Sequence, residues 1–225
     1  MQAAYHREIS KTYLANVQKI NLIPHGVSYN PSFCEGLATL KVRAKSGQAQ
    51  LKMLYVGYLL EYKGVQDTIK ALAILNKELY VDTVLTIVGE GPYKPELMKL
   101  AKRLGIEDKI IWKSFVKRDE LIKEYCQADV VVFPSKGEMF GLVAYEALAL
   151  GKPVIVAKKA ALIECCYKYA NCMCVESVKE LAEKIIELSD HLCTLTNLRS
   201  PPSWSEVVTK YLELYSQIYK VRGGV

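Results

Sequence analysis

The stretch DVVVFPSKGEMFGLVAYEALALGKPVIVA, residues 129–157, contains a strand, a loop, a helix and a second strand. Its two apolar runs, 129–135 and 153–157, are rich in β-branched residues, and their apolar positions are consecutive rather than alternating. That pattern is typical of strands buried on both faces of a parallel sheet. Residues 142–150 have helical spacing and end at a Gly-Lys-Pro sequence, which stops the helix and leads into the second strand.

The same alternation extends through most of the chain. Further strands are predicted at 51–57, 83–89, 109–113 and, more weakly, 171–175. Further helices are predicted at 65–78, 94–104, 118–126, 178–188 and 206–219. Strands and helices that alternate with short connections form right-handed crossovers. The sequence therefore predicts an α/β fold with a doubly wound parallel sheet.

Residues 1–50 do not share this alternation. They suggest a helix over 9–19 and a short strand over 20–24, followed by a polar, flexible stretch. We therefore divide the chain into an N-terminal annex, a linker, a main α/β domain and a C-terminal helical segment. These four parts are residues 1–30, 31–50, 51–200 and 201–225.

Composition narrows the class of protein. The chain is 51% hydrophobic and 24% charged, and no uncharged apolar run approaches the length of a membrane span. The N-terminus carries charges where a signal peptide is apolar, so we expect a cytoplasmic protein. The net charge is +6, and residues 1–50 carry an excess of positive charge. This excess suits an anionic lipid or an acidic partner, although solvated surface charge is the simpler interpretation. There is no nucleic-acid-binding motif.

Seven cysteines are present, and five of them lie between Cys165 and Cys193. Their spacing contains no C-x-x-C pair, so it does not match a zinc site. Buried reduced thiols are the favoured interpretation, and a disulfide is the alternative. We predict no metal site.

Ligands of an open parallel sheet bind beyond the carboxyl ends of the strands, so the loops after the apolar runs are informative. In VGYLLEYKG, residues 56–64, Gly57 ends a strand and Lys63 stands just before a helix. A lysine beside a helix N-terminus suits a phosphate, although a solvated lysine is the alternative. The glycines of IVGEGP, residues 87–92, indicate a tight turn and no dinucleotide fingerprint.

The third loop, within FPSKGEMFGLVAYEALALG, is the most informative. Glu138 lies in the loop, Gly141 stands at the helix entrance, and Glu146 falls on the second turn of the helix. The first amides of the helix, at Gly141 and Leu142, are donors without partners within the helix. Carboxylates accept paired hydrogen bonds from vicinal hydroxyls. A sugar, a diphosphate and a ribose could therefore be held in sequence here; helix-favourable glutamates without a ligand are the alternative.

Taken together, VG-x5-KG, VGEGP and FPSKGEMFGLVAYEALALGKPVI resemble the retaining GT-B glycosyltransferases of family GT4, whose C-terminal domain carries an E-x7-E motif. NLIPHGVSYNPSF, residues 21–33, resembles the element that closes their N-terminal domain. The final helix resembles the one that crosses back to that domain. The resemblance implies a Rossmann-like C-terminal domain of the GT-B fold, with residues 1–30 as a remnant of the acceptor-side domain.

The resemblance also implies roles for individual residues. Lys63 would contact the donor diphosphate, Glu138 the hydroxyls of the donor sugar, and Glu146 the ribose. Lys63 and Glu138 would be the catalytic residues. The other implied donor-binding positions are Gly57, Tyr58, Val116, Phe140, Gly141 and Leu142. The donor would be linked to UDP or GDP, and transfer would need neither a metal nor another cofactor.

Several residues depart from the family pattern. Tyr58 stands where the family usually has an arginine, so a charged phosphate ligand is replaced by a neutral hydroxyl. Other departures are His25, Ser28, Ser114 and Ala160-Ala161. Besides a glycosyltransferase or its donor-binding subunit, these changes leave open a degenerate module that binds a nucleotide sugar without catalysis.

The acceptor-side domain of the family is represented here by about 30 residues. An unpaired strand and an uncovered apolar helix favour association. We therefore expect an acceptor-binding partner chain or a homo-oligomer. Peripheral membrane contact, usual in the family, would be made mainly by the missing domain.

Overall fold

The computed structural model describes residues 21, 23–29, 31–34, 50–77, 81–138, 140–158, 162–191 and 199–221. Their centre is a six-stranded sheet in which every pair of neighbours is parallel, with the order β3-β2-β1-β4-β5-β6. The strands are β1 (Leu51–Val56), β2 (Thr83–Val88), β3 (Ile110–Lys113), β4 (Val130–Phe133), β5 (Val154–Ala157) and β6 (Cys172–Val175). The predicted doubly wound parallel sheet is confirmed.

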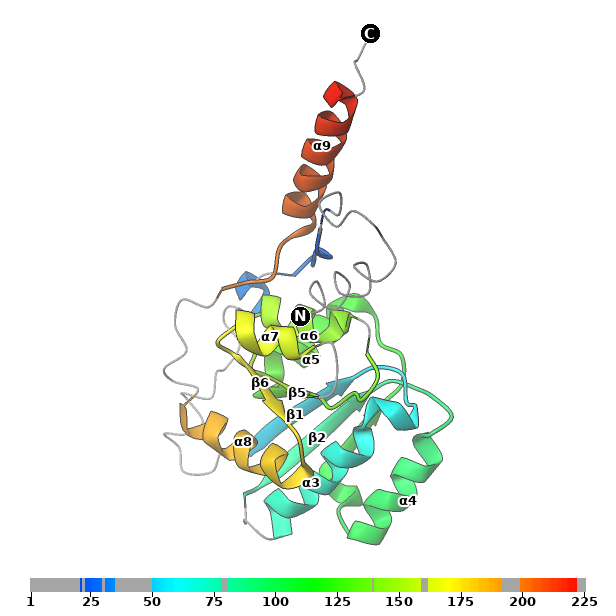
Figure 1. The fold of residues 1–225 in the computed structure, drawn as a ribbon. Coiled ribbons are helices and arrows are strands. Elements are labelled where there is room, and N and C mark those ends of the chain that lie inside the picture. The colour runs from blue at the N-terminus through cyan, green and yellow to red at the C-terminus, as the bar shows by residue number, and fades with distance from the viewer. Residues whose placement is uncertain are drawn as a thin grey trace.

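Helices cover both faces of the sheet (Figure 1). One face packs against α3 (Val65–Lys77), α4 (Lys94–Leu104) and α8 (Val178–His191). The other packs against α5 (Arg118–Gln127), α6 (Leu142–Ala149) and α7 (Ile163–Lys168). Strand β1 serves both cores, because Met53 and Tyr55 face the first and Leu54 and Val56 face the second. Burial on both faces explains its continuous apolar run.

The predicted elements agree with the observed ones to within a few residues at their ends. The missed helix is α7, whose six residues, IECCYK, are too few to show a helical period. Short 3-10 helices, η2 (Pro31–Cys34), η3 (Glu61–Lys63) and η4 (Glu107–Lys109), also went unpredicted. The expected strand over 109–113 begins one residue later because Lys109 ends η4.

The N-terminal region differs from its prediction. The expected helix over 9–19 lies outside the described residues. In the expected strand over 20–24, the described residues 21, 23 and 24 form no strand. Instead, Val27 makes a single parallel bridge with Ser203. A lone segment that meets no sheet edge can form little more than such a bridge.

A disulfide joins Cys34 of η2 to Cys126 of α5. The favoured interpretation of reduced cysteines is therefore wrong for this pair, which the sequence pattern did not suggest. It holds for Cys165 and Cys172, which are free and buried, whereas Cys166 and Cys174 are free but only partly buried. Cys193 lies outside the described residues. The start of the expected linker, residues 31–50, is thus attached to α5.

The final helix, α9 (Trp204–Val221), projects from the main domain (Figure 1). Val207 in its first turn is buried, whereas large apolar side chains farther along are exposed. These are Val208, Tyr211, Leu212, Tyr215, Ile218 and Tyr219. The uncovered apolar helix expected from the sequence is present. No helix in the described part of the chain is long and apolar enough to cross a membrane.

Candidate functional site

The strand order reverses between β1 and β4, which are neighbours in the sheet but lie far apart in the sequence. Their carboxyl ends therefore lie side by side, and the loops that follow them meet. The backbone N–H of Lys136, after β4, donates to the carbonyl of Tyr62, after β1, at 2.8 Å. In open α/β sheets such a reversal point is where ligands bind.

Lys63 and Glu138 meet across this reversal point. The Lys63 Nζ lies 2.5 Å from Glu138 Oε2, and each side chain is 16% exposed. Lys63 Nζ also lies 5.3 Å from the centre of the Tyr62 ring. Two residues separated by 75 positions in the sequence thus form a partly buried, charge-assisted pair. The sequence predicted both residues but not their contact.

Gly64 sets the position of Lys63. It closes η3 with a left-handed backbone (φ 75°), and α3 begins at the next residue. A Cβ at this glycine would lie 2.2 Å from the carbonyl oxygen of Pro134. The loop after β4 therefore packs directly on the glycine, and this close approach brings Glu138 within reach of Lys63.

The N-terminus of α6 lies a few residues beyond Glu138. Gly141 precedes the helix with φ 72°, and no side chain in the described residues caps the helix at this residue. Leu142, the first helical residue, is exposed. Phe140 is held between the His25 ring at 4.6 Å and the Tyr145 ring at 4.9 Å. At the donor-rich end of α6, Gly141 is buried, Leu142 is exposed, and the adjacent Phe140 ring is packed between two other rings.

Glu146 lies one turn farther along α6, in a setting of its own. The hydroxyl of Tyr125, which is buried, donates to Glu146 Oε2 at 3.0 Å. Burial raises the pKa of the Glu146 carboxyl, while the Tyr125 hydrogen bond and the charge of Arg118 act to lower it. Sequence reasoning missed Tyr125 and Arg118, because a contact between α5 and α6 leaves no linear pattern.

The remaining predicted positions surround this edge of the sheet. Gly57 and Tyr58 follow β1, and Tyr58 is 57% exposed at the place where the family usually has an arginine. Val116 follows β3 and packs against the same core as α5 and α6. Ala160 and Ala161 lie outside the described residues. All the predicted donor-binding residues therefore lie at or beyond the carboxyl edge of the sheet, except Glu146, which is within α6.

Replacing Tyr125 with phenylalanine should raise the pKa of Glu146 further. The change removes a hydrogen bond to the charged form and leaves burial, the dominant influence, in place. Carboxyl NMR titration measures the pKa directly, with Glu146→Gln to assign the signal. The signal of Glu183, exposed on α8, serves as the internal reference. An unchanged or lower Glu146 pKa in the variant would show that the hydrogen bond does not stabilise the carboxylate.

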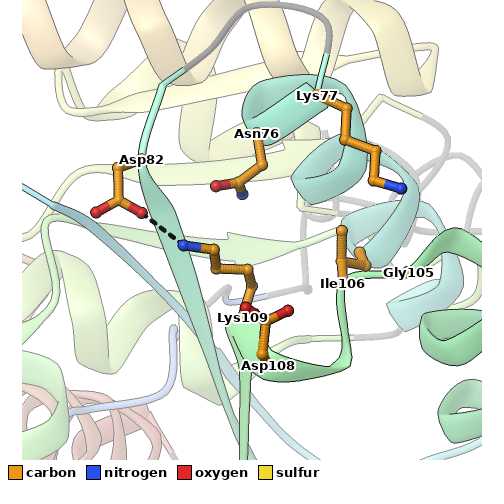
Figure 2. Close-up of a pocket in the computed structure, with 7 residues that line it drawn as sticks. All are labelled: Asn76, Lys77, Asp82, Gly105, Ile106, Asp108 and Lys109. Atoms are coloured by element: carbon orange, nitrogen blue, oxygen red, sulfur yellow. Dashed lines mark hydrogen bonds and ion pairs between the residues drawn. The ribbon is translucent and has the colours of Figure 1, made fainter.

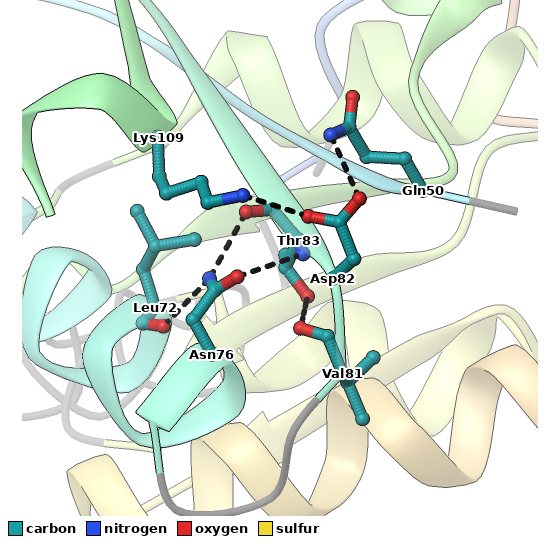
Figure 3. Close-up of polar contacts among 7 residues, drawn as sticks. All are labelled: Gln50, Leu72, Asn76, Val81, Asp82, Thr83 and Lys109. Carbon is teal, nitrogen blue, oxygen red and sulfur yellow. Dashed lines mark hydrogen bonds and ion pairs between the residues drawn. The ribbon is translucent and has the colours of Figure 1, made fainter. Parts of the chain in front are cut away.

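A separate cavity of about 460 Å³ lies at the opposite edge of the sheet. Figure 2 shows Asp82 and Lys109 among its lining residues, joined at 2.9 Å. Asn76 bridges α3 to β2 by hydrogen bonds with the backbone of Thr83, and Gln50 donates to Asp82 (Figure 3). These polar groups satisfy one another. The cavity is at the amino ends of the strands, away from the loops described above.

In the described residues, no group of three or more His, Cys, Asp or Glu side chains is arranged to hold a metal ion. The positive charge at the carboxyl edge comes instead from Lys63, Arg118 and the N-terminus of α6. The strand order 3-2-1-4-5-6, with these groups gathered near its reversal point, defines a Rossmann-like, nucleotide-binding class of α/β domain.

Residues 39–195 match the family model of the group 1 glycosyl transferases, and the chain belongs to this family. It is 41% identical over 113 residues to an uncharacterised glycosyltransferase of Methanocaldococcus jannaschii, covering 50% of this chain and 28% of that protein. It is 34% identical over 166 residues to the D-inositol 3-phosphate glycosyltransferase of Streptomyces scabiei, covering 69% and 37%. The chain thus spans well under half the length of these relatives.

Solved structures agree. The C-terminal domain of a group 1 glycosyl transferase from Francisella tularensis is 26% identical, with a TM-score of 0.58 over 72% of this chain and 85% of that one. Anabaena HepE, solved with UDP and glucose, is 20% identical with a TM-score of 0.69, over 93% and 60%. The resemblance to the C-terminal domain of the GT-B fold is confirmed.

Proposed function

We propose that this domain binds the nucleoside diphosphate part of a nucleotide sugar and forms the donor-binding half of a retaining glycosyltransferase. The observation that carries the proposal is the Lys63–Glu138 pair, which spans the reversal point of the sheet beside the open N-terminus of α6. HepE, a structural neighbour, was solved with UDP and glucose, which supports a donor of this kind.

The chemistry of the pair suits a donor diphosphate. Without ligand, the ammonium of Lys63 and the carboxylate of Glu138 neutralise each other at 2.5 Å. A diphosphate would draw the ammonium to itself, which frees Glu138 to accept hydrogen bonds from sugar hydroxyls. Together with the amides at the start of α6, Lys63 would stabilise the negative charge of the departing diphosphate.

Glu146 would hold the other end of the donor. Its carboxylate can accept two hydrogen bonds from the vicinal hydroxyls of a ribose, and Tyr125 fixes its orientation. The order Glu138, N-terminus of α6, Glu146 then corresponds to sugar, diphosphate and ribose. UDP and GDP donors both fit this order.

The acceptor would be held by a second domain that packs against this one. The exposed apolar side chains of α9 support this part of the proposal, because so much uncovered apolar surface on one helix favours association. Peripheral membrane contact would belong to that second domain.

A thermal-shift titration with UDP, GDP, UDP-glucose, UDP-N-acetylglucosamine and GDP-mannose tests donor binding. A ligand at 100 times its Kd stabilises the folded state by about 2.7 kcal/mol. We expect a clear shift with one nucleotide series. Folded protein that responds to none of these ligands would contradict the proposal.

Glu146→Ala should weaken the binding of the preferred nucleotide by about 1 kcal/mol or more, because a charge-assisted hydrogen bond is lost. Calorimetric Kd values check the loss. Glu183→Ala, at an exposed position of α8, is the matched control and should bind normally. Equal Kd values for Glu146→Ala and the unmodified chain would remove the ribose role.

Binding without transfer is the second candidate, and Tyr58 favours it. A neutral, exposed tyrosine replaces the arginine expected beside the diphosphate. The two candidates differ when the chain is combined with an acceptor-binding domain of the family. A donor-binding half should then transfer sugar, whereas a degenerate module should bind the donor and transfer none.

A further inference from the structure

A segment outside the main domain lies against the Glu146 end of the site. We call its described residues, 23–29 and 31–34, the N-terminal segment. On one side, the N–H of Val27 donates to the carbonyl of Pro202 at 2.9 Å, just before α9. On the other side, Cys34 is joined to Cys126 of α5 by the disulfide. The His25 ring also packs on Phe140, so the segment is held at several points, of which the disulfide is the covalent one.

Tyr29 lies between Val27 and Cys34 and faces the Glu146 cluster. Its ring centre is 6.3 Å from that of Tyr125, whose hydroxyl binds Glu146. The Arg118 guanidinium lies 5.1 Å from the Tyr29 ring centre, in a cation–π contact. Tyr29 thus contacts Tyr125, which orients Glu146, and Arg118, whose charge acts on the Glu146 carboxyl.

Electrostatics agree with this placement. The pKa of Tyr29 is raised by burial and by the charge of Glu146, and is lowered by Arg118. The pKa of Glu146 in turn responds to Arg118. The cluster offers an aromatic face from Tyr29, hydrogen-bond donors from Arg118 and an acceptor from Glu146. A nucleoside, with its flat base and its hydroxyls, needs these three kinds of contact.

The disulfide is placed to control this arrangement. Cys126 directly follows Tyr125 on α5, and Cys34 ends the N-terminal segment five residues after Tyr29. Cys126 is 2% exposed, whereas Cys34 is partly exposed. An attacking thiolate therefore reaches the sulfur of Cys34 more readily than that of Cys126.

We propose that Tyr29 and Arg118 form a wall of the nucleoside subsite, and that the Cys34–Cys126 disulfide holds this wall against Glu146. The inference rests on the proposed function, because it assigns the subsite to the nucleoside end of a donor. Reduction of the disulfide releases the covalent attachment of the segment, next to Tyr125. The chain should then bind nucleosides more weakly.

The redox step balances with a dithiol as reductant. A thiolate of the dithiol attacks the Cys34 sulfur and breaks the S–S bond, with Cys126 as the leaving thiolate. The second thiol of the reductant then displaces Cys34 and closes an internal disulfide. Two electrons and two protons pass to the protein, which ends with two thiols, and the reductant is oxidised.

The test is calorimetric titration of the full chain with UMP, GMP and inorganic pyrophosphate, before and after treatment with dithiothreitol. Alkylation and mass spectrometry count the free thiols in each sample. Reduction should weaken the preferred nucleoside monophosphate by about three- to tenfold, as expected when one aromatic wall is lost. Pyrophosphate affinity should not change, because pyrophosphate lacks the nucleoside.

Three variants, Tyr29→Ala, Tyr29→Phe and Cys34→Ser, separate positioning from general stability. In the oxidised chain, Tyr29→Ala should lose as much affinity as reduction does, whereas Tyr29→Phe should keep most of it. Cys34→Ser should bind the nucleoside monophosphate as weakly as the reduced chain does, and dithiothreitol should not change its affinity. In the reduced chain, Tyr29→Ala should add little further loss, because the two changes remove the same contact.

The outcomes distinguish this inference from the proposed function. If the oxidised, folded chain binds no nucleotide, the proposed function fails and the inference fails with it. If it binds a nucleoside monophosphate equally well oxidised and reduced, or equally well with Tyr29→Ala, only the inference is overturned. Loss of pyrophosphate affinity on reduction would also overturn it, because the disulfide would then act on the whole site.

Discussion

Replacing Gly64 with alanine should lower the free energy of unfolding by more than about 3 kcal/mol. Two costs add at this residue. An alanine at φ 75° is strained, and its Cβ would lie 2.2 Å from the carbonyl oxygen of Pro134. That oxygen is backbone, so relief requires the loop after β4 to move. Urea unfolding followed by circular dichroism measures the loss.

Gly151→Ala is the matched control. Gly151 has a similar left-handed backbone, φ 73°, but nothing in the described structure lies within 4 Å of a Cβ built there. Its cost should be about 1 kcal/mol, from backbone strain alone. Equal losses for the two variants would mean that the contact with Pro134 does not hold the two loops together.

Replacing Lys63 with alanine should weaken the preferred nucleoside diphosphate by about 10- to 100-fold, the loss expected for hydrogen bonds between charged groups. The matching monophosphate should change far less, because in our proposal Lys63 contacts the diphosphate and Glu146 the ribose. Calorimetric titrations with UDP and UMP, and with GDP and GMP, measure the difference.

Lys70→Ala controls for the loss of a positive charge. Lys70 lies on α3, is about half exposed and pairs with Asp67 at 3.6 Å. It should bind both ligands normally. If Lys63→Ala weakens mono- and diphosphates by the same factor, Lys63 does not recognise the additional phosphate group, and its proposed role is wrong.

Most of the fold could be predicted because its strands are buried on both faces. The continuous apolar runs of β1, β2, β4 and β5 and the glycines that follow helices are local signals. Helix α7 is less than two turns long and gives no such signal. The strand over 20–24 was expected from its apolar letters, but a strand also needs a neighbour, which local sequence does not reveal.

The residues of the site also fall into those that local sequence could indicate and those that depend on packing. The positions of Lys63, Glu138 and Glu146 near the ends of the strands could be predicted, because each stands at a strand–helix junction or on the first turns of a helix. Tyr29, Arg118 and Tyr125 could not, since their contacts depend on how α5 packs against α6 and the N-terminal segment. The disulfide joins residues 92 positions apart, and no spacing rule for cysteines connects them.

The attachment of Val27 beside the base of α9 links the projecting helix to the N-terminal segment. Pro202 and Ser203, which hold Val27, immediately precede α9, and a Cβ at Gly26 would touch the backbone of Trp204. A molecule bound along the 18 residues of α9 would act on a helix whose base is attached to the peptide that carries Tyr29. Rotation of α9 would move the peptide that precedes Tyr29, while the disulfide at Cys34 holds the peptide that follows it.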